Sequence, residues 1–192
     1  FKSINQKDKL LGYFIETFTS KYNFNDFKEI IPAEKAKAFN DVMDESLKKS
    51  GLMKGYLDGI RTEAKRLLLA KEYEKGMSLI ENEIIQKGRA TDLDYGFQGD
   101  FYLMTKQYIK AEVAIKKAIS MNATNIEHQL RLAHVYLFSD RVSDAKDIHK
   151  KYRSNNVSSS KSWVQATKED FENFKKNGLP TDDFKKILRI LE

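Results

Sequence analysis

The sequence predicts an all-α protein built from antiparallel helix hairpins, on three observations. Only two prolines, Pro32 and Pro180, and nine glycines occur in 192 residues, so long stretches contain no residue that breaks a helix. Apolar residues recur three and four positions apart, which is the spacing of one helical face. A pattern of small and large residues also recurs at an interval of roughly 34 residues, and such a period predicts stacked helical units.

Composition agrees with a folded helical protein and excludes several kinds of chemistry. Hydrophobic residues make up 41% of the chain and charged residues 32%, a balance typical of soluble, folded proteins. The chain contains no cysteine, which excludes disulfides, thiolate nucleophiles and cysteine-ligated zinc. No apolar stretch approaches the roughly 18–20 residues of a membrane-spanning helix, so we expect no membrane span.

The net charge of +6 raises the question of nucleic-acid binding, and its distribution argues against it. Lys and Arg exceed Asp and Glu by two in each of the segments 1–56, 57–152 and 153–192. A nucleic-acid binder gathers its basic residues on one face or in one block. Evenly mixed Lys and Glu on helices are typical of a solvated surface.

Residues 1–56 predict an N-terminal helical region. A helical apolar stripe begins at Leu10 and ends at Phe18. A short helix through Phe27 and Ile31 is expected next, and Pro32 ends or bends it. The following helix, over residues 33–50, carries one apolar face: Ala36, Phe39, Val42, Met43 and Leu47. No repeat aligns with this region, which is either a set of degenerate hairpins or a separate unit.

The rest of the chain predicts helix after helix. One helix covers about residues 52–70, and pairs of shorter helices continue to Tyr152. The polar run 154–160 is the clearest linker. Two helices follow, and their apolar positions are Trp163, Phe171 and Phe174 in one and Phe184, Ile187, Leu188 and Leu191 in the other.

The internal repeat relates residues 92–125 to residues 126–159. Five positions match at a constant interval: Gly99 with Ala133, Tyr102 with Tyr136, Tyr108 with Val142, Ala111 with Ala145, and Ala118 with Tyr152. A less regular copy over residues 57–90 precedes them at an interval longer by one, so one residue is inserted between these copies. In this copy Ala64, Leu67, Tyr73, Gly76 and Ile80 stand for Gly99, Tyr102, Tyr108, Ala111 and Ile115.

These residues resemble the tetratricopeptide repeat (TPR) family, whose unit is a pair of helices about 34 residues long. Gly99 and Ala111 stand where the family places small residues so that two helices approach closely. Thr91 with Asp94, and Thr124 with Glu127, are expected to cap the first helix of each repeat. The resemblance covers residues 57–157 and implies a right-handed superhelical solenoid of antiparallel hairpins.

The chain also departs from the family pattern. The large aromatic residue near the start of each repeat is Tyr95 in the middle copy but Ile60 and Gln129 in the others. The proline that usually follows each repeat is absent. A generic helical bundle therefore stays open as an alternative. The helices of residues 158–192 are expected to cap the array, with Trp163 in the core.

No pattern of catalytic or metal-binding residues stands out. His128 and His134 lie six positions apart, a spacing that does not place two ligands on one helical face. The pair Asp92 and Asp94 is typical of a helix start, and neither a phosphate-binding glycine loop nor a Gly-x-Ser-x-Gly motif occurs. We therefore expect a protein that is not an enzyme and has no metal and no cofactor.

In the TPR family the first helix of each repeat lines a concave groove that holds a peptide or a partner helix. The residues that this resemblance places in the groove are Arg61, Lys65, Phe97, Asp100, Arg131 and His134. Phe97 is the expected apolar anchor, unless neighbouring helices cover it. Asp100 argues against the clamp with which some members of the family hold a terminal carboxylate.

The predicted function is a non-catalytic scaffold or adaptor that binds a protein or peptide ligand. One alternative is a structural protein that assembles with copies of itself. Another is an accessory domain of a larger enzyme or sensor, because the chain starts at Phe1 rather than at methionine. The segment from Ser162 to Gly178 resembles tails that follow such repeats in bacterial proteins, which indicates a bacterial protein of the cytoplasm or periplasm.

Overall fold

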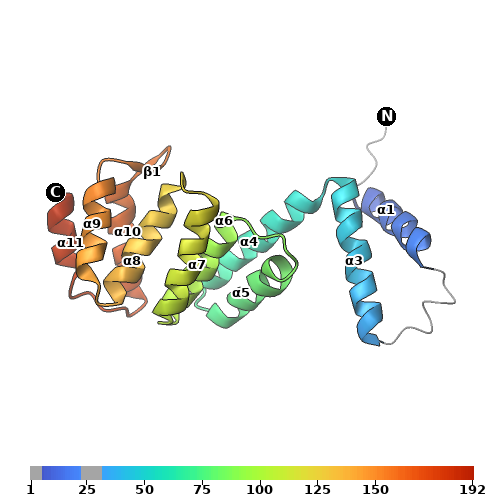
Figure 1. Ribbon diagram of the computed structural model, residues 1–192, viewed down its shortest axis with the longest axis horizontal. Coiled ribbons are helices and arrows are strands. Elements are labelled where there is room, and N and C mark those ends of the chain that lie inside the picture. Colours follow the sequence, from blue (N-terminus) through green and yellow to red (C-terminus); the bar gives the residue numbers. More distant parts are fainter. Residues whose placement is uncertain (1–5, 23–31) are drawn as a thin grey trace. The chain divides into compact units, whose positions relative to one another are not determined.

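The computed structural model describes residues 6–22 and 32–192, and the short helix predicted through Phe27 and Ile31 lies outside them. The chain divides into two compact units, residues 1–59 and 60–192. The described residues form ten α-helices, one π-helical turn and one sheet of two short strands (Figure 1). The prediction of an all-α protein is therefore confirmed, apart from this small sheet.

The first unit contains helices α1 (Gln6–Lys21) and α3 (Pro32–Ser50). Phe14 packs against Phe39 with the ring centroids 5.1 Å apart, and Val42 is fully buried. The two helices bury only part of their apolar stripes, because Leu11 and Ile15 keep 57% and 53% of their exposure. This unit therefore presents an apolar face of its own.

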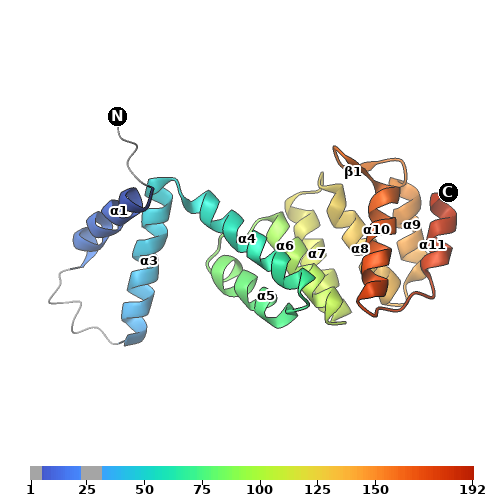
Figure 2. The ribbon, with the colours of Figure 1, turned by 180° about the vertical axis from the view of Figure 1, so that it is seen from behind.

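The boundary between the two units lies within helix α4 (Met53–Leu69), because the second unit begins at residue 60. The helices that follow are joined by short connections and run antiparallel to their predecessors (Figures 1 and 2). Their bounds are α5 Tyr73–Ile80, α6 Asp92–Met104, α7 Tyr108–Met121, α8 Ile126–Phe138, α9 Val142–Tyr152, α10 Trp163–Lys176 and α11 Phe184–Leu191.

The first helix of each of four pairs (α4–α5, α6–α7, α8–α9 and α10–α11) ends in a turn of the same geometry, which also follows α3 at Gly51 and η1 at Gly88. A residue with positive φ occupies the turn of each pair: Lys71, Lys106, Asp140 and Gly178. In each turn a backbone N–H also donates to the carbonyl five residues earlier, which is typical of a left-handed helix C-cap. The donors are Glu72, Gln107, Arg141 and Leu179, and the acceptors are Leu67, Tyr102, Tyr136 and Phe174. The last pair, expected only as a cap, thus ends its first helix as the repeat units do.

Two glycines show why small residues recur in the pattern. A Cβ added to Gly99 in α6 would lie 2.4 Å from Cγ1 of Ile115 in α7. A Cβ added to Gly76 in α5 would lie 2.3 Å from Cζ of Phe101 in α6. Both distances are far shorter than any van der Waals contact, so the helices approach this closely only at glycine. The packing role predicted for Gly99 is confirmed.

The residue inserted after the first copy lies in a π-helical turn, η1 (Glu81–Ile85), which continues α5. The N–H of Gln86 donates to the carbonyl of Glu81, five residues back, at 2.9 Å. A π-turn accommodates one extra residue without ending the helix. The longer interval between the first two copies is thereby absorbed inside a helix, and Ile80 just before the turn and Ile84 within it stay fully buried.

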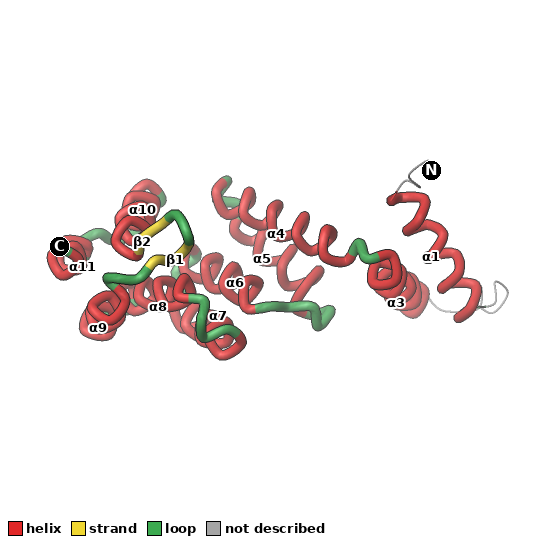
Figure 3. Tube along the Cα trace, turned by 90° about the horizontal axis from the view of Figure 1, so that it is seen from above, coloured by secondary structure: helices red, strands yellow, loops and turns green. Residues whose placement is uncertain are grey.

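The segment predicted as a polar linker, 154–160, contains the first of the two strands, and the second follows it directly. β1 (Asn156–Ser158) pairs antiparallel with β2 (Lys161–Ser162), beside the start of α10 (Figure 3). The hydroxyl of Ser162 accepts from the N–H of Gln165 and caps α10.

Two further helix caps can be compared with those predicted from the sequence. Asp94 caps α6 together with Thr91 as predicted, whereas α8 is capped by Asn125 and not by Thr124.

A core cluster of the second unit extends from α6 to α11, and its large aromatic residues lie in the last four helices. Trp163 is fully buried, as predicted, and its indole N–H donates to Nδ1 of His149 at 2.9 Å. Phe171 and Phe184 stack with ring centroids 4.0 Å apart. Burial of each large apolar side chain contributes about 1.5–3 kcal/mol, so this aromatic cluster holds α10 and α11 firmly to α8 and α9.

Candidate binding groove

A pocket of about 260 Å³ opens between the first helices of the four pairs. Its walls combine aliphatic, aromatic, amide and charged side chains, and the β-hairpin closes one side. The lining residues are Leu68 and Leu69 of α4; Asp100, Leu103 and Met104 of α6; Glu127, Leu130, Arg131 and His134 of α8; Val157 and Lys161 of the hairpin; and Ala166, Asp170, Asn173, Phe174 and Asn177 of α10. We call this pocket the groove.

Two contacts beside the groove join the first helix pair to the last. The hydroxyl of Tyr73 lies 3.4 Å from Oδ1 of Asn177, and Nζ of Lys71 lies 3.4 Å from the carbonyl of Lys176. The turn after α4 therefore meets the end of α10, although the two lie far apart in the sequence. These contacts border the groove where the C-terminal end of α10 lies, since Asn177 also lines it.

Arg131 is the central cation of the groove. Its Nε lies 3.1 Å from both carboxylate oxygens of Asp100, and its Nη2 lies 2.9 Å from Glu127. Arg131 and Asp100 keep only 17% and 21% of their side-chain exposure. Burial raises the pKa of Asp100 above its ordinary value, and the charge of Arg131 counteracts part of that rise.

Asp170 is the carboxylate of the groove that forms no ion pair with Arg131 or any other Arg or Lys side chain among the described residues. The part of the chain that the structure describes offers it no hydrogen bond, and its nearest charged-type neighbour is Nδ1 of His134 at 3.8 Å. Burial, together with the negative charges of Asp100 and Glu127, raises the pKa of Asp170 to about 7, and the positive charges of Arg131 and Lys161 counteract part of that rise. At neutral pH this position therefore holds a partly charged carboxylate, whose side chain keeps 39% of its exposure.

His134 lines the same pocket and is 2% exposed. Burial lowers its pKa well below the ordinary value, with smaller contributions from His149 and Arg131. The imidazole is consequently neutral at pH 7 and supplies no charge to Asp170. Its Nε2 has no hydrogen-bond partner among the described residues, which is a costly state for a buried polar atom.

The structure brings together three of the six residues that the sequence placed in a groove, Asp100, Arg131 and His134. The other three lie elsewhere. Arg61 donates from Nε and Nη2 to Asp94, both at 2.8 Å. Lys65 is exposed and Phe97 is half-buried, and neither lines the groove.

The sequence pattern missed the whole contribution of α10, including Asp170 and Asn173. The turns after the first helices of the pairs are marked by Lys71, Lys106, Asp140 and Gly178. The last interval, from Asp140 to Gly178, is longer than the two before it because the β-hairpin precedes α10. A search at the constant period of the repeat therefore does not align the fourth pair.

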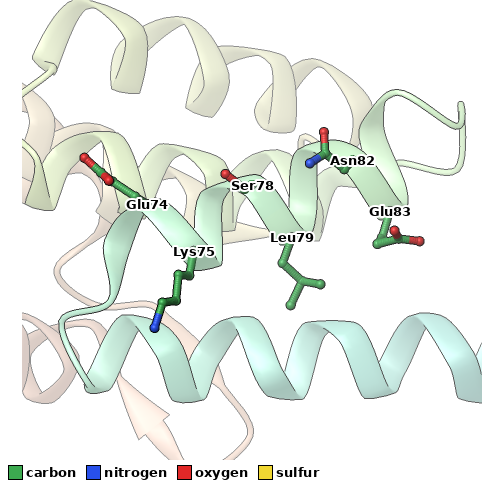
Figure 4. Close-up of a pocket in the computed structure, with 6 residues that line it drawn as sticks. All are labelled: Glu74, Lys75, Ser78, Leu79, Asn82 and Glu83. Atoms are coloured by element: carbon green, nitrogen blue, oxygen red, sulfur yellow. The ribbon is translucent and has the colours of Figure 1, made fainter.

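Two other hollows lack converging polar groups. One is a shallow hollow lined by α5 and η1 alone, and Figure 4 shows Lys75 and Leu79 pointing to one side of this helical stretch and Ser78 and Asn82 to the other. Lys75 is also paired with Glu72. The second lies on α6 and α7 beside the exposed residue Ile109 and is mainly apolar. Of these three hollows among the described residues, the groove alone combines apolar walls with buried titratable groups.

Among the described residues, no three His, Asp or Glu side chains are grouped so that they could hold a metal ion. No helix in this part of the chain has the length and apolar character needed to cross a membrane. Comparison of the chain with protein-family models, with curated proteins and with solved structures finds no match. The function proposed below is therefore based on the residues and geometry of this chain.

Proposed function

We propose that this chain is a non-catalytic protein-interaction module of the tetratricopeptide type, whose groove holds a segment of a partner protein. In this proposal the four helix pairs stack as a right-handed solenoid, with α4, α6, α8 and α10 on its concave side. The recurring turns support the repeat, as does the close approach of helices at Gly76 and Gly99. Such arrays present extended concave surfaces to their partners.

The observation that carries the proposal is the composition of the groove. One helix of every pair contributes to it, so the surface exists only when the pairs are stacked. Its aliphatic residues include Leu69, which keeps 74% of its exposure, next to the charged cluster of Asp100, Arg131 and Asp170. Apolar surface with a few fixed polar groups is typical of binding sites, and a large exposed apolar residue at the rim marks where a partner gains burial.

Site-specific photocrosslinking tests this proposal. A photoreactive phenylalanine analogue is introduced at Met104 or Asn173 in the groove, and at Lys117 on α7 as the matched control away from it. Irradiation in the source cells should yield one defined protein adduct from both groove positions and none from Lys117. The same adducts from all three positions, or none from any, would contradict binding in the groove.

Self-assembly is the second candidate, and the exposed apolar face of the first unit favours it. Leu11, Ile15 and Phe39 keep about half of their exposure there. Sedimentation equilibrium over a wide range of protein concentration measures the mass directly. Under this alternative the mass rises with concentration and returns to that of one chain in a Leu11→Lys, Ile15→Lys variant. Under the groove proposal the chain is monomeric throughout.

A further inference from the structure

We infer that the groove selects a basic side chain: a partner segment inserts one Lys or Arg residue between apolar walls and places its cationic group beside Asp170. This inference rests on the proposed function and specifies the chemistry of the segment that the groove holds. Three properties of the pocket carry it: the balance of its charges, the partners of each charged group and the size of the cavity.

Carboxylate side chains outnumber basic side chains among the residues that line the groove. Asp100, Glu127 and Asp170 line it together with two basic residues, Arg131 and Lys161. Arg131 forms ion pairs with Asp100 and Glu127. Nζ of Lys161 lies 2.6 Å from Glu169, a residue outside the lining. Both cations therefore already have close carboxylate partners, and Asp170 feels their charges only at longer range. Among the described residues it forms no ion pair with Lys or Arg.

The site is consequently complementary to one added positive charge. A partly buried carboxylate is stabilised by an opposite charge within about 4–6 Å, and the pair gains further when hydrogen bonds satisfy its remaining polar atoms. Asp170 supplies the charge, and Asn173, which lies on the next turn of α10, supplies a carbonyl acceptor to the same pocket. An ammonium or guanidinium group carries several donors that match these groups.

The apolar walls fit the rest of such a side chain. Leu103, Met104, Leu130 and Phe174 line the pocket, and Lys and Arg bury their aliphatic stems against apolar surface while the charged group finds polar partners. The volume of about 260 Å³ is below the roughly 300–1,000 Å³ of pockets that enclose whole small molecules. The pocket thus suits one inserted side chain, with Leu69 at the rim for an apolar neighbour in the partner segment.

Selection from a phage-displayed library of random peptides tests this inference on the full chain. Three baits are compared: the wild type, Asp170→Asn, and Asp147→Asn as the matched control. Asp147 lies on α9 outside the groove, with 72% of its side chain exposed. Asn preserves the size of Asp170 and removes its charge, and circular dichroism verifies that both variants keep the helical content of the wild type.

The wild type and Asp147→Asn should enrich peptides in which Lys or Arg is flanked by aliphatic or aromatic residues, and Asp170→Asn should not. A fourth bait, the groove variant Leu69→Glu, changes an exposed residue at the rim. Enrichment of peptides without a basic residue, lost in this variant, would contradict the inference but not the proposed function. Enrichment that neither Asp170 nor the groove variant alters, or no enrichment from any bait, would count against both.

Calorimetry on one selected peptide measures the contribution of the charge. Replacement of its basic residue by norleucine should weaken binding about tenfold or more, and replacement by Glu should weaken it further. Asp170→Asn should weaken binding of the basic peptide to the same degree without weakening binding of the norleucine peptide. Affinity for the basic peptide should also rise between pH 6 and pH 8 in the wild type, as Asp170 ionises, and stay flat in Asp170→Asn. Equal binding of all three peptides to the wild type would contradict the inference.

Discussion

The guanidinium of Arg61 donates two hydrogen bonds of 2.8 Å to the carboxylate of Asp94. Asp94 is fully buried and Arg61 keeps 15% of its side-chain exposure. The same carboxylate also accepts from the N–H and the hydroxyl of Thr91 at the start of α6. One pair of residues therefore ties α4 to the N-terminus of α6 and fixes the first helix pair to the second.

Substitution of Arg61 by Ala should destabilise the second unit by about 3 kcal/mol, because it leaves a buried carboxylate without its cation. Urea unfolding followed by circular dichroism measures this loss. Arg66→Ala is the control, since Arg66 pairs with Glu63 on the exposed side of α4 and its loss should leave the unfolding free energy nearly unchanged. A small effect of Arg61→Ala, equal to that of Arg66→Ala, would show that the pair has no structural role.

Substitution of Gly99 by Ala should also destabilise the protein, by about 1–3 kcal/mol. Helix propensity alone favours Ala over Gly by about 1 kcal/mol, but the added Cβ would lie 2.4 Å from Ile115, and this clash decides the sign. Gly59 is the matched control, since a Cβ there meets nothing within 4 Å. Gly59→Ala should stabilise the chain in the same thermal unfolding assay. A gain in stability for both variants would show that α6 and α7 separate at little cost.

Helix content and the packing glycines could be predicted from sequence because both depend on local spacing. Apolar periodicity identifies a helix without knowledge of its neighbours. A small residue is required at Gly99 because the next helix along the chain packs against it, and the repeat shows this requirement as a small residue at each matching position. The extra residue of the first interval was likewise visible, and it lies in the π-turn η1.

The groove was only partly predictable, because its residues are chosen by contacts between distant elements. Arg61 stands on the first helix of a repeat, as a groove residue should, but Asp94 of the next repeat engages it. The spacing within one helix does not reveal such a partner. Asp170 was missed for another reason: the polar run 154–160 was interpreted as a linker, whereas its β-hairpin leads into α10 and lengthens the last interval of the repeat.

Acidification below pH 6.5 should destabilise the protein through its buried histidines. The pKa of His149 is lowered by burial to about 4, so between pH 6.5 and 4 the unfolded chain binds a proton that the folded chain excludes. Stability from His149 is therefore fully present above pH 6.5 and is lost as the pH falls, by about 2 kcal/mol at pH 5. His134 acts in the same direction.

Thermal unfolding at pH 7.5 and pH 5 measures this loss, and His149→Gln supplies the comparison. The variant should be less stable than the wild type at pH 7.5, because Trp163 then lacks its acceptor Nδ1. Its stability should fall less between the two pH values. A wild type and a variant with the same pH dependence would show that His149 does not exclude a proton in the folded state.

Asp170 should affect stability in the direction opposite to the histidines, because its ionisation destabilises the fold as the pH rises. Substitution of Asp170 by Asn should therefore stabilise the protein in the absence of a partner. The pKa of Asp170 is raised to about 7, so the folded chain binds a proton more tightly than the unfolded chain between pH 4 and pH 7. The wild type consequently loses stability as the pH rises through this range, and above pH 7 the full penalty remains. The side chain keeps 39% of its exposure, so solvent reduces the penalty, and Asn should restore about 1 kcal/mol at pH 8.

Thermal unfolding at pH 8 and pH 4 separates this effect from a general change in packing. Asp170→Asn should raise the melting temperature at pH 8 by a few degrees and leave it nearly unchanged at pH 4, while Asp147→Asn should alter neither value. A gain in stability that accompanies a loss of peptide binding is typical of residues retained for function rather than for folding. A variant less stable than the wild type at pH 8 would instead make Asp170 a structural residue, with a favourable partner in the folded protein.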